Sequence, residues 1–278
     1  MSVLLAACAA EPPPPPAEPA PMPGMAIEYA VPPGGVLTYA MADTVTLTFG
    51  AGVLANMRIE GGYHATVRTS WEPADGAFLV RARVEDFSGE LRNPMAGNTR
   101  STEEDVQGEW VVLLTTRGTS ELLEAPSVSR AFRDVVGTND LLRNAFLRLP
   151  PEPVRRGDSW TDTIRVEERG SDQVETSTTV VTSTWAGDSV IGERTLWIIR
   201  STTETTLRIE SVSDGTEVVQ SLEGGTDAET LFDPERGLIV SADERGLLTG
   251  TLDVPDAGLT QVPLTARVRR HMALRRNE

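Results

Sequence analysis

The chain has 278 residues and a formal net charge of −16, and only 5% of its residues are aromatic. A chain this acidic repels the phosphate backbone of nucleic acids, so we expect no nucleic-acid partner. The length allows one large β domain or two small ones. No apolar run approaches the roughly 18–20 residues that span a bilayer as a helix. The sequence therefore predicts a domain that is soluble or attached to a membrane by other means.

The first short apolar stretch of the chain ends at Cys8. Cys8 is the only cysteine, so no disulfide can form within the chain. The segment Leu5-Ala6-Ala7-Cys8 resembles the lipobox of bacterial lipoproteins, in which the cysteine is acylated and becomes the N-terminus. The resemblance implies that residues 1–8 are the remnant of a lipoprotein signal and that Cys8 is the lipidation site. Neither a basic segment nor a full apolar core precedes Cys8, which departs from the family pattern. The alternative is a chance sequence in a cytoplasmic chain.

The segment after Cys8, residues 9–24, is rich in Pro, Ala and Glu. It cannot bury a core, and we expect a polyproline II tether, in which Glu11–Pro23 at about 3.1 Å per residue reaches roughly 40 Å. A tether between anchor and domain agrees with the lipoprotein resemblance. Ala9 stands where an aspartate would often retain a lipoprotein in the inner membrane. The resemblance therefore implies the periplasmic face of the outer membrane.

The chain from residue 25 onward is dominated by β patterns. Apolar and polar residues alternate from Val36, and Trp110–Leu114 is a wholly apolar run typical of a strand buried on both faces. Turn sequences separate the strands, because Pro fixes φ and Gly accepts positive φ. Turns are predicted at residues 73–76, 187–188, 214–215 and 233–237. Strands and helices do not alternate along the sequence, as they would in a parallel sheet. We therefore expect one antiparallel meander in a single domain, residues 25–276.

One stretch, residues 127–149, has helical spacing and predicts a helical hairpin between the two β regions. In the first helix, Ser127 is the expected N-cap and Gly137 the expected C-terminal residue. The second helix is expected to start at Thr138 or Asn139 and to end at Pro150. The apolar face of the hairpin is formed by Val128, Phe132, Val135, Val136, Leu141, Leu142, Ala145, Phe146 and Leu149.

The segment that follows, Leu149-Pro150-Pro151-Glu152-Pro153-Val154-Arg155-Arg156-Gly157-Asp158-Ser159-Trp160, resembles an LPxxPVxxGDSW motif of uncharacterised bacterial lipoprotein domains. Residues 232–237, FDPERG, resemble the same group. Those domains in turn look like the Lol lipoprotein carriers, whose fold is an open half-barrel with helices over its concave side. The resemblance implies a mainly β fold, a large curved antiparallel half-barrel with the helical hairpin packed on it. It transfers no ligand-binding residue.

Five residues are candidates for a ligand pocket or its lid: Phe132, Val135, Leu142, Phe146 and Trp160. An apolar pocket with few polar groups would suit a lipid-like ligand. The alternative is that the hairpin fills the concavity and leaves a solid core, with Trp160 as part of it. Asp158 could be catalytic, but an acceptor in a turn is the simpler interpretation.

Catalytic and metal sites have little support in the sequence, so we expect no enzyme and no cofactor. His64 and His271 are far apart and lack zinc-binding spacing, and no GxSxG segment is present. Glu103-Glu104-Asp105 lacks the spacing of a calcium loop and suggests a solvated loop. Five arginines near the C-terminus could contact anionic lipids or an acidic partner, or simply lie on a solvated strand and tail. They are Arg267, Arg269, Arg270, Arg275 and Arg276.

Two functional hypotheses follow. The first is a non-enzymatic envelope lipoprotein that holds a lipid-like or apolar ligand under a helical lid. The second is a structural or interaction domain, accessory to an envelope protein complex, with a solid core and no ligand. The side chains on the inner face of the sheet distinguish the two.

Overall fold

The computed structural model describes residues 24–275 except 51, 137–140, 143–144, 170–172 and 214. Strands dominate, and the described residues contain one α-helix and four short 3₁₀ turns. The strands are β1 (Val36–Phe49), β2 (Arg58–Ala74), β3 (Ala77–Asn93), β4 (Gly97–Thr102), β5 (Val106–Gln107), β6 (Trp110–Thr115), β7 (Ser120–Glu124), β8 (Ser127–Val128), β9 (Ser159–Arg169), β10 (Gln173–Ile191), β11 (Arg194–Ser213), β12 (Thr216–Asp233), β13 (Leu238–Val254) and β14 (Leu259–Leu274). The helix is α1 (Arg130–Val136), and the 3₁₀ turns are η1 (Pro33–Gly35), η2 (Gly52–Leu54), η3 (Glu103–Asp105) and η4 (Pro255–Ala257).

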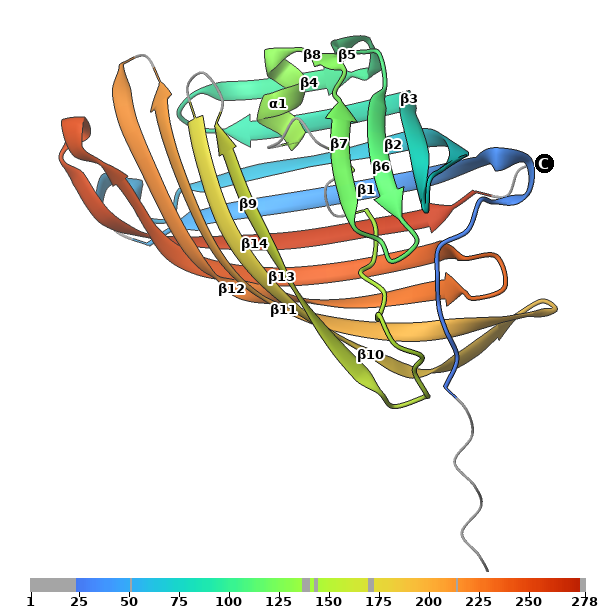
Figure 1. The fold of residues 1–278 in the computed structure, drawn as a ribbon. Helices are drawn as coiled ribbons and strands as arrows, with labels where there is room; N and C mark the ends of the chain where they lie inside the picture. The colour runs from blue at the N-terminus through green and yellow to red at the C-terminus, as the bar shows by residue number, and fades with distance from the viewer. Residues whose placement is uncertain are drawn as a thin grey trace, which may run out of the picture.

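Twelve of the strands form one antiparallel sheet that curls into an open half-barrel, as the sequence predicted (Figure 1). The order is β7-β6-β3-β2-β1-β14-β13-β12-β11-β10-β9, with β4 paired to β3. The chain therefore starts in the middle, moves outward to one edge at β7, crosses to the other edge at β9 and returns. Its last strand, β14, pairs with its first, β1, over Tyr39–Phe49. The hairpins on both sides of this pairing are local, which gives the meander.

Most of the predicted turns are present. Ala74 pairs with Ala77 around Gly76, whose φ is 74°, and Asp233 pairs with Leu238 around Gly237, whose φ is 60°. Strands β11 and β12 pair up to Ser213 and Thr216, as the predicted turn at 214–215 requires. The turn predicted at 187–188 is wrong, because β10 continues through it to Ile191.

The irregularity at residues 187–188 is a β-bulge instead of a turn. The register between β10 and β11 shifts between Trp185 and Gly187. The indole Nε1 of Trp185 donates to the Gly187 carbonyl at 3.0 Å and to Asp188 Oδ1 at 3.1 Å. The glycine and aspartate that suggested a turn therefore serve a bulge, which adds one residue to a strand without ending it.

The helix α1 confirms the first half of the predicted hairpin. Its N-cap is Ser129, whose hydroxyl accepts from the Phe132 amide at 3.1 Å, and not Ser127, which lies in β8. The second predicted helix is wrong in its described part: Leu141 and Leu142 form a turn, and residues 145–149 are irregular. Gly137, Thr138 and Asn139 lie outside the described residues. No described helix has the length and apolar character needed to cross a membrane.

The helix packs on the inner face of β2, β3 and β4 at one end of the sheet. Phe132 is fully buried, and its ring centroid lies 4.9 Å from that of Phe87 and 6.3 Å from that of Trp110. Gly89 makes this approach possible, because a Cβ there would lie 2.5 Å from Val135 Cγ1. A second, smaller apolar cluster lies on the same face of the sheet at the far end of β12, β13 and β14, around Leu222, Leu252 and Leu264.

Candidate functional site

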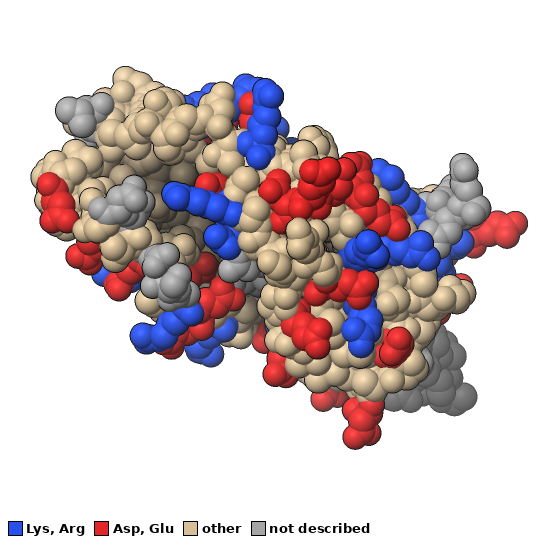
Figure 2. Space-filling view, turned by 90° about the horizontal axis from the view of Figure 1, so that it is seen from above, with Lys and Arg blue, Asp and Glu red and all other residues tan. Residues whose placement is uncertain are grey.

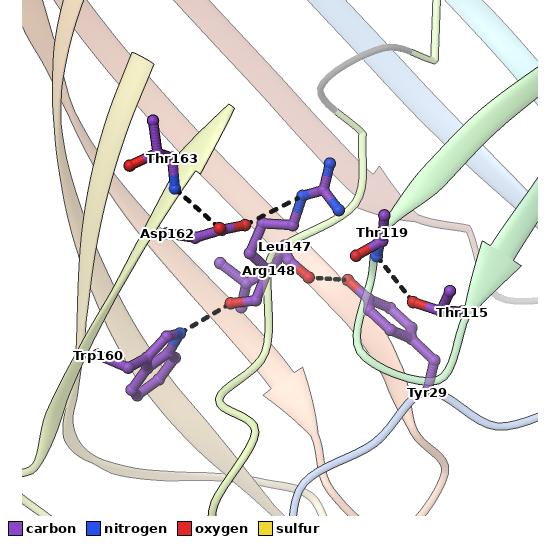
Figure 3. A network of polar contacts seen from close by, with 8 residues as sticks. All are labelled: Tyr29, Thr115, Thr119, Leu147, Arg148, Trp160, Asp162 and Thr163. Atoms are coloured by element: carbon purple, nitrogen blue, oxygen red, sulfur yellow. Dashed lines mark hydrogen bonds and ion pairs between the residues drawn. The ribbon is translucent and has the colours of Figure 1, made fainter. Parts of the chain in front are cut away.

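The two edges of the sheet are joined by an irregular segment, residues 145–158, which we call the strap (yellow-green below α1 in Figure 1). On one side, the Leu149 amide donates to the Arg117 carbonyl in the β6–β7 turn at 2.9 Å. On the other side, Trp160 Nε1 in β9 donates to the Arg148 carbonyl at 2.8 Å (Figure 3). The strap thus closes the half-barrel into a ring at this level.

The chain before β1 reinforces this closure. Met25 and Val154 exchange two backbone hydrogen bonds, of 2.8 and 3.0 Å, which fix the start of the described chain to the strap. Tyr29 is 3% exposed and donates its hydroxyl to the Leu147 carbonyl at 3.1 Å. Burial raises the pKa of Tyr29, so its hydroxyl stays a donor at every physiological pH.

The space under α1 and the strap is filled. Leu142 and Phe146 pack there against Tyr29, Trp71 and Met41, and the remaining void is 20 Å³. That volume holds about one water molecule and no ligand. This end of the half-barrel is a solid core.

The five predicted pocket or lid residues divide accordingly. Phe132 and Val135 on α1 and Leu142 in the following turn are buried in the solid core. Trp160 is partly buried at the start of β9 and binds the strap. Phe146 is the one of the five that borders open space, because it lies between the core and a groove.

The groove is a hollow of about 340 Å³ on the inner face of β9–β14, beyond the strap. Its volume lies at the lower end of the range for ligand sites. Residues of the strap form one end of the groove, and its floor is the uncovered part of the sheet. Seen from above, this end of the molecule is hollowed and walled mostly by uncharged residues (Figure 2). The aliphatic lining includes Ile164, Val166, Val181, Leu207, Leu248 and Val268.

An ion triad lies at the edge of the groove floor, where β1, β14 and β13 are side by side, and two of its members, Glu244 and Arg270, line the groove. Arg270 Nε donates to Asp43 Oδ2 at 3.0 Å, and Arg270 Nη1 lies 3.6 Å from Glu244 Oε2. The three side chains are 29%, 14% and 26% exposed, in the order Arg270, Asp43 and Glu244. Burial raises the pKa of the Asp43 carboxyl, and the charge of Arg270 offsets this only in part. For Arg270, burial lowers the pKa, and the carboxylates of Asp43 and Glu244 reverse the shift to a net increase.

Hydroxyl groups line the floor next to the triad, on β10, β11 and β12. They form cross-strand pairs: Thr179 Oγ1 lies 3.0 Å from Thr205 Oγ1, and Thr203 Oγ1 lies 3.0 Å from Thr226 Oγ1. Each hydroxyl pair uses one donor and one acceptor and leaves further capacity toward the groove. The sequence signal was the run of Thr and Ser in residues 176–184 and 201–206, which predicted strands but not the face that they occupy. A polar belt therefore separates the solid core from the second apolar cluster.

A larger hollow, of about 710 Å³, lies on the other face of the same strands. The register places most of its lining side chains, such as Arg165, Thr178, Thr206 and Glu223, opposite the groove residues. This hollow is an open trough with a charged surface. Four charged residues are among those that line it, and no residue of the strap encloses it, in contrast to the groove.

The other candidate residues from the sequence that the structure describes, Asp158 and Asp105, have structural roles. Asp158 accepts from the Arg155 amide at 2.8 Å, the turn role that was the simpler interpretation. Asp105 in η3 accepts from Ser101 Oγ and the Thr102 amide, each at 2.9 Å, and the Ser129 hydrogen bond is the first of several that lower its pKa. Cys8 and Arg276 lie outside the described residues.

The histidines and the acidic groups do not assemble a metal centre in the described part of the chain. His271 lies on the outer face, with its Nδ1 2.9 Å from Asp243 Oδ1. No cluster of three or more His, Cys, Asp or Glu side chains suited to a metal ion occurs among the described residues. Arg270 differs from the expectation for the C-terminal arginines. Its side chain faces inward and pairs with Asp43 in the triad, whereas the expectation was a side chain exposed to solvent or to an anionic partner.

Comparison with protein-family models gives no match for this chain. Comparison with the sequences of curated proteins gives no match either.

Proposed function

We propose that this protein is a non-enzymatic lipoprotein of the bacterial cell envelope that holds a lipid-like ligand in the groove of its half-barrel. The observation that supports the proposal is the groove itself, an aliphatic-walled hollow of about 340 Å³ beside a strap and a solid core. The ligand lies beyond the strap and not under α1, where the void of 20 Å³ leaves no room. The strap closes one end of the site, and the other end stays accessible.

Attachment to the membrane belongs to the same proposal. Lipid on Cys8 would anchor the chain, with the Pro-rich tether between the anchor and the domain. One acyl chain binds weakly, whereas several chains at about 0.8 kcal/mol per buried CH₂ anchor firmly. We place the protein on the periplasmic face of the outer membrane. Cys8→Ser should move the protein to the soluble fraction and remove an acyl mass from its N-terminal peptide.

A matched pair of variants tests the groove. Val181 lines the groove, whereas its neighbour Val180 points to the opposite face of β10, because successive residues of a strand alternate. Val181→Trp should abolish saturable uptake of a fluorescent fatty-acid analogue by the tether-free domain, and Val180→Trp should leave uptake unchanged. Equal uptake by both variants would place any binding elsewhere. Circular dichroism of both variants controls for folding.

The second candidate function is a structural or interaction domain, accessory to an envelope protein complex. The solid core under α1 favours it, because the helix and strap fill the space that a lid would leave. It predicts that no lipid co-purifies with the domain and that the analogue shows no saturable uptake. Mass spectrometry of material extracted from the purified domain separates the two functions.

A further inference from the structure

Both arginines that line the described part of the groove already lie next to carboxylates of the protein. Two guanidinium groups, Arg148 and Arg270, line it, and no third one does so among the described residues. Arg148 Nε lies 3.7 Å from Asp162 Oδ2, and Arg270 is shared by two carboxylates. Each arginine is already neutralised by a carboxylate of the protein.

The pairing of both arginines with carboxylates determines which polar end of a ligand the groove can accept. A phosphate or carboxylate placed beside the triad would meet the two carboxylates of Asp43 and Glu244 around the one guanidinium group of Arg270, and partial burial strengthens that repulsion. A neutral group has no such penalty. It can accept from an Nη group of Arg270, because Nε donates to Asp43 and Nη1 lies 3.6 Å from Glu244 Oε2, which is longer than an ordinary hydrogen bond.

The hydroxyl groups on the groove floor, which we call the hydroxyl belt, favour a ligand with its own hydroxyl and carbonyl groups. The hydroxyls of Ser177, Thr179, Ser201, Thr203, Thr205 and Thr226 lie on the groove floor beside aliphatic residues. A bare hydrocarbon chain across these hydroxyls would remove from water the donor and acceptor positions that their cross-strand pairs leave unused, which is unfavourable. A ligand that carries its own hydroxyl and carbonyl groups next to an acyl chain satisfies both the belt and the aliphatic wall.

We propose that the groove selects neutral acyl amphiphiles with a hydroxylated head, such as monoacylglycerols or acylated sugars, and rejects anionic lipids. The head lies on the belt formed by the triad and the paired threonines, and the chain lies along the aliphatic wall. This proposal rests on the function proposed above, since it names the ligand class of the same groove.

Three probes with one C18:1 chain test the selectivity by displacement of a groove-bound apolar dye below their micellar concentrations. They are monoolein, methyl oleate and oleate. Monoolein should bind most tightly, and ionised oleate should bind at least about tenfold more weakly. Glu244→Gln removes one carboxylate next to Arg270 and should narrow the gap between oleate and monoolein. Oleate binding as tightly as monoolein would overturn the proposal while leaving a lipid site in place.

A second variant tests the hydroxyl belt alone. Thr179→Val with Thr205→Val replaces both members of one hydroxyl pair by isosteric residues, which costs little stability because no partner is left unpaired. This double variant should remove the advantage of monoolein over methyl oleate and leave methyl oleate unchanged. The matched control is Thr178→Val with Thr206→Val, the neighbouring cross-strand pair on the opposite face. An unchanged advantage in the groove variant would overturn the assignment of the head to the belt. Failure of all three probes to displace the dye would instead contradict the lipid-binding function itself.

Discussion

Tyr29 and Trp160 hold the strap from opposite sides by donating to consecutive carbonyls. Tyr29 Oη lies 3.1 Å from the Leu147 oxygen, and Trp160 Nε1 lies 2.8 Å from the Arg148 oxygen (Figure 3). The two donors come from the chain before β1 and from the start of β9, which are 131 residues apart in the sequence (160 − 29). The strap belongs to no strand, so these two side chains and the backbone hydrogen bonds at Leu149 and Val154 fix its path.

We predict that both donors stabilise the strap and that their effects are coupled. Tyr29→Phe removes only the hydroxyl and leaves the Leu147 carbonyl without this partner, at a cost of about 1–3 kcal/mol. Trp160→Phe should cost at least as much, because it also removes packing. The double variant should depart from additivity by about 0.5 kcal/mol or more, since the acceptors are adjacent. Urea denaturation of the four proteins provides the measurement, and strict additivity would show that the two ends of the strap open independently.

The packing of α1 on the sheet gives a second prediction. Phe132→Ala empties a fully buried site between Phe87 and Trp110 and should destabilise the domain by about 3–5 kcal/mol. The comparison is Leu122→Ala on the edge strand β7, where the side chain is 38% exposed and the cost should stay within about 0.5 kcal/mol. Thermal unfolding monitored by circular dichroism distinguishes the two. Similar small losses would mean that α1 does not seal the core in solution.

A third prediction concerns the space that Gly89 leaves for the helix. Gly89→Ala places a Cβ about 2.5 Å from Val135 Cγ1 and should cost about 1–3 kcal/mol through overpacking. Adding Val135→Ala removes the opposing methyl groups and should cost less than the sum of the two single changes. Chemical denaturation of the single and double variants reports the rescue. Additive losses would indicate that Gly89 is required for another reason.

The fourth prediction concerns pH and the triad. The pKa of Asp43 is raised in the folded state above its usual value of 3.8, so the folded protein takes up this proton more readily than the unfolded chain. The ionised carboxylate therefore opposes folding above the folded pKa, and this cost disappears as the pH falls through it. As the pH falls through the raised folded-state pKa toward 3.8, the wild type should gain stability relative to Asp43→Asn, which cannot titrate. Denaturation midpoints of both proteins across this window test the sign. A relative loss by the wild type would show that pairing with Arg270 outweighs burial.

Local patterns in the sequence predicted the parts of the fold that depend on neighbouring residues. Alternation of apolar and polar residues indicated the strands, and the Gly-bearing turns at 73–76 and 233–237 placed two hairpins, because φ preferences act within a few residues. Helical spacing around Phe132 indicated both α1 and the buried face of that helix. The open half-barrel followed from resemblance to a family, and the structure confirmed it.

The tertiary structure alone decided where those elements meet. The pairing of β1 with β14 brings Asp43 next to Arg270 across 227 residues, and no local pattern carries that register. The spacing of Leu142 and Phe146 is helical, yet the chain there is turn and strap, and Tyr29 and Trp160 donate to the carbonyls that follow at Leu147 and Arg148. The Thr-rich strands could have placed either set of hydroxyls inside, since a shift of one residue exchanges the two faces. Burial of the long-range core fixes that choice, and with it the polar floor of the groove.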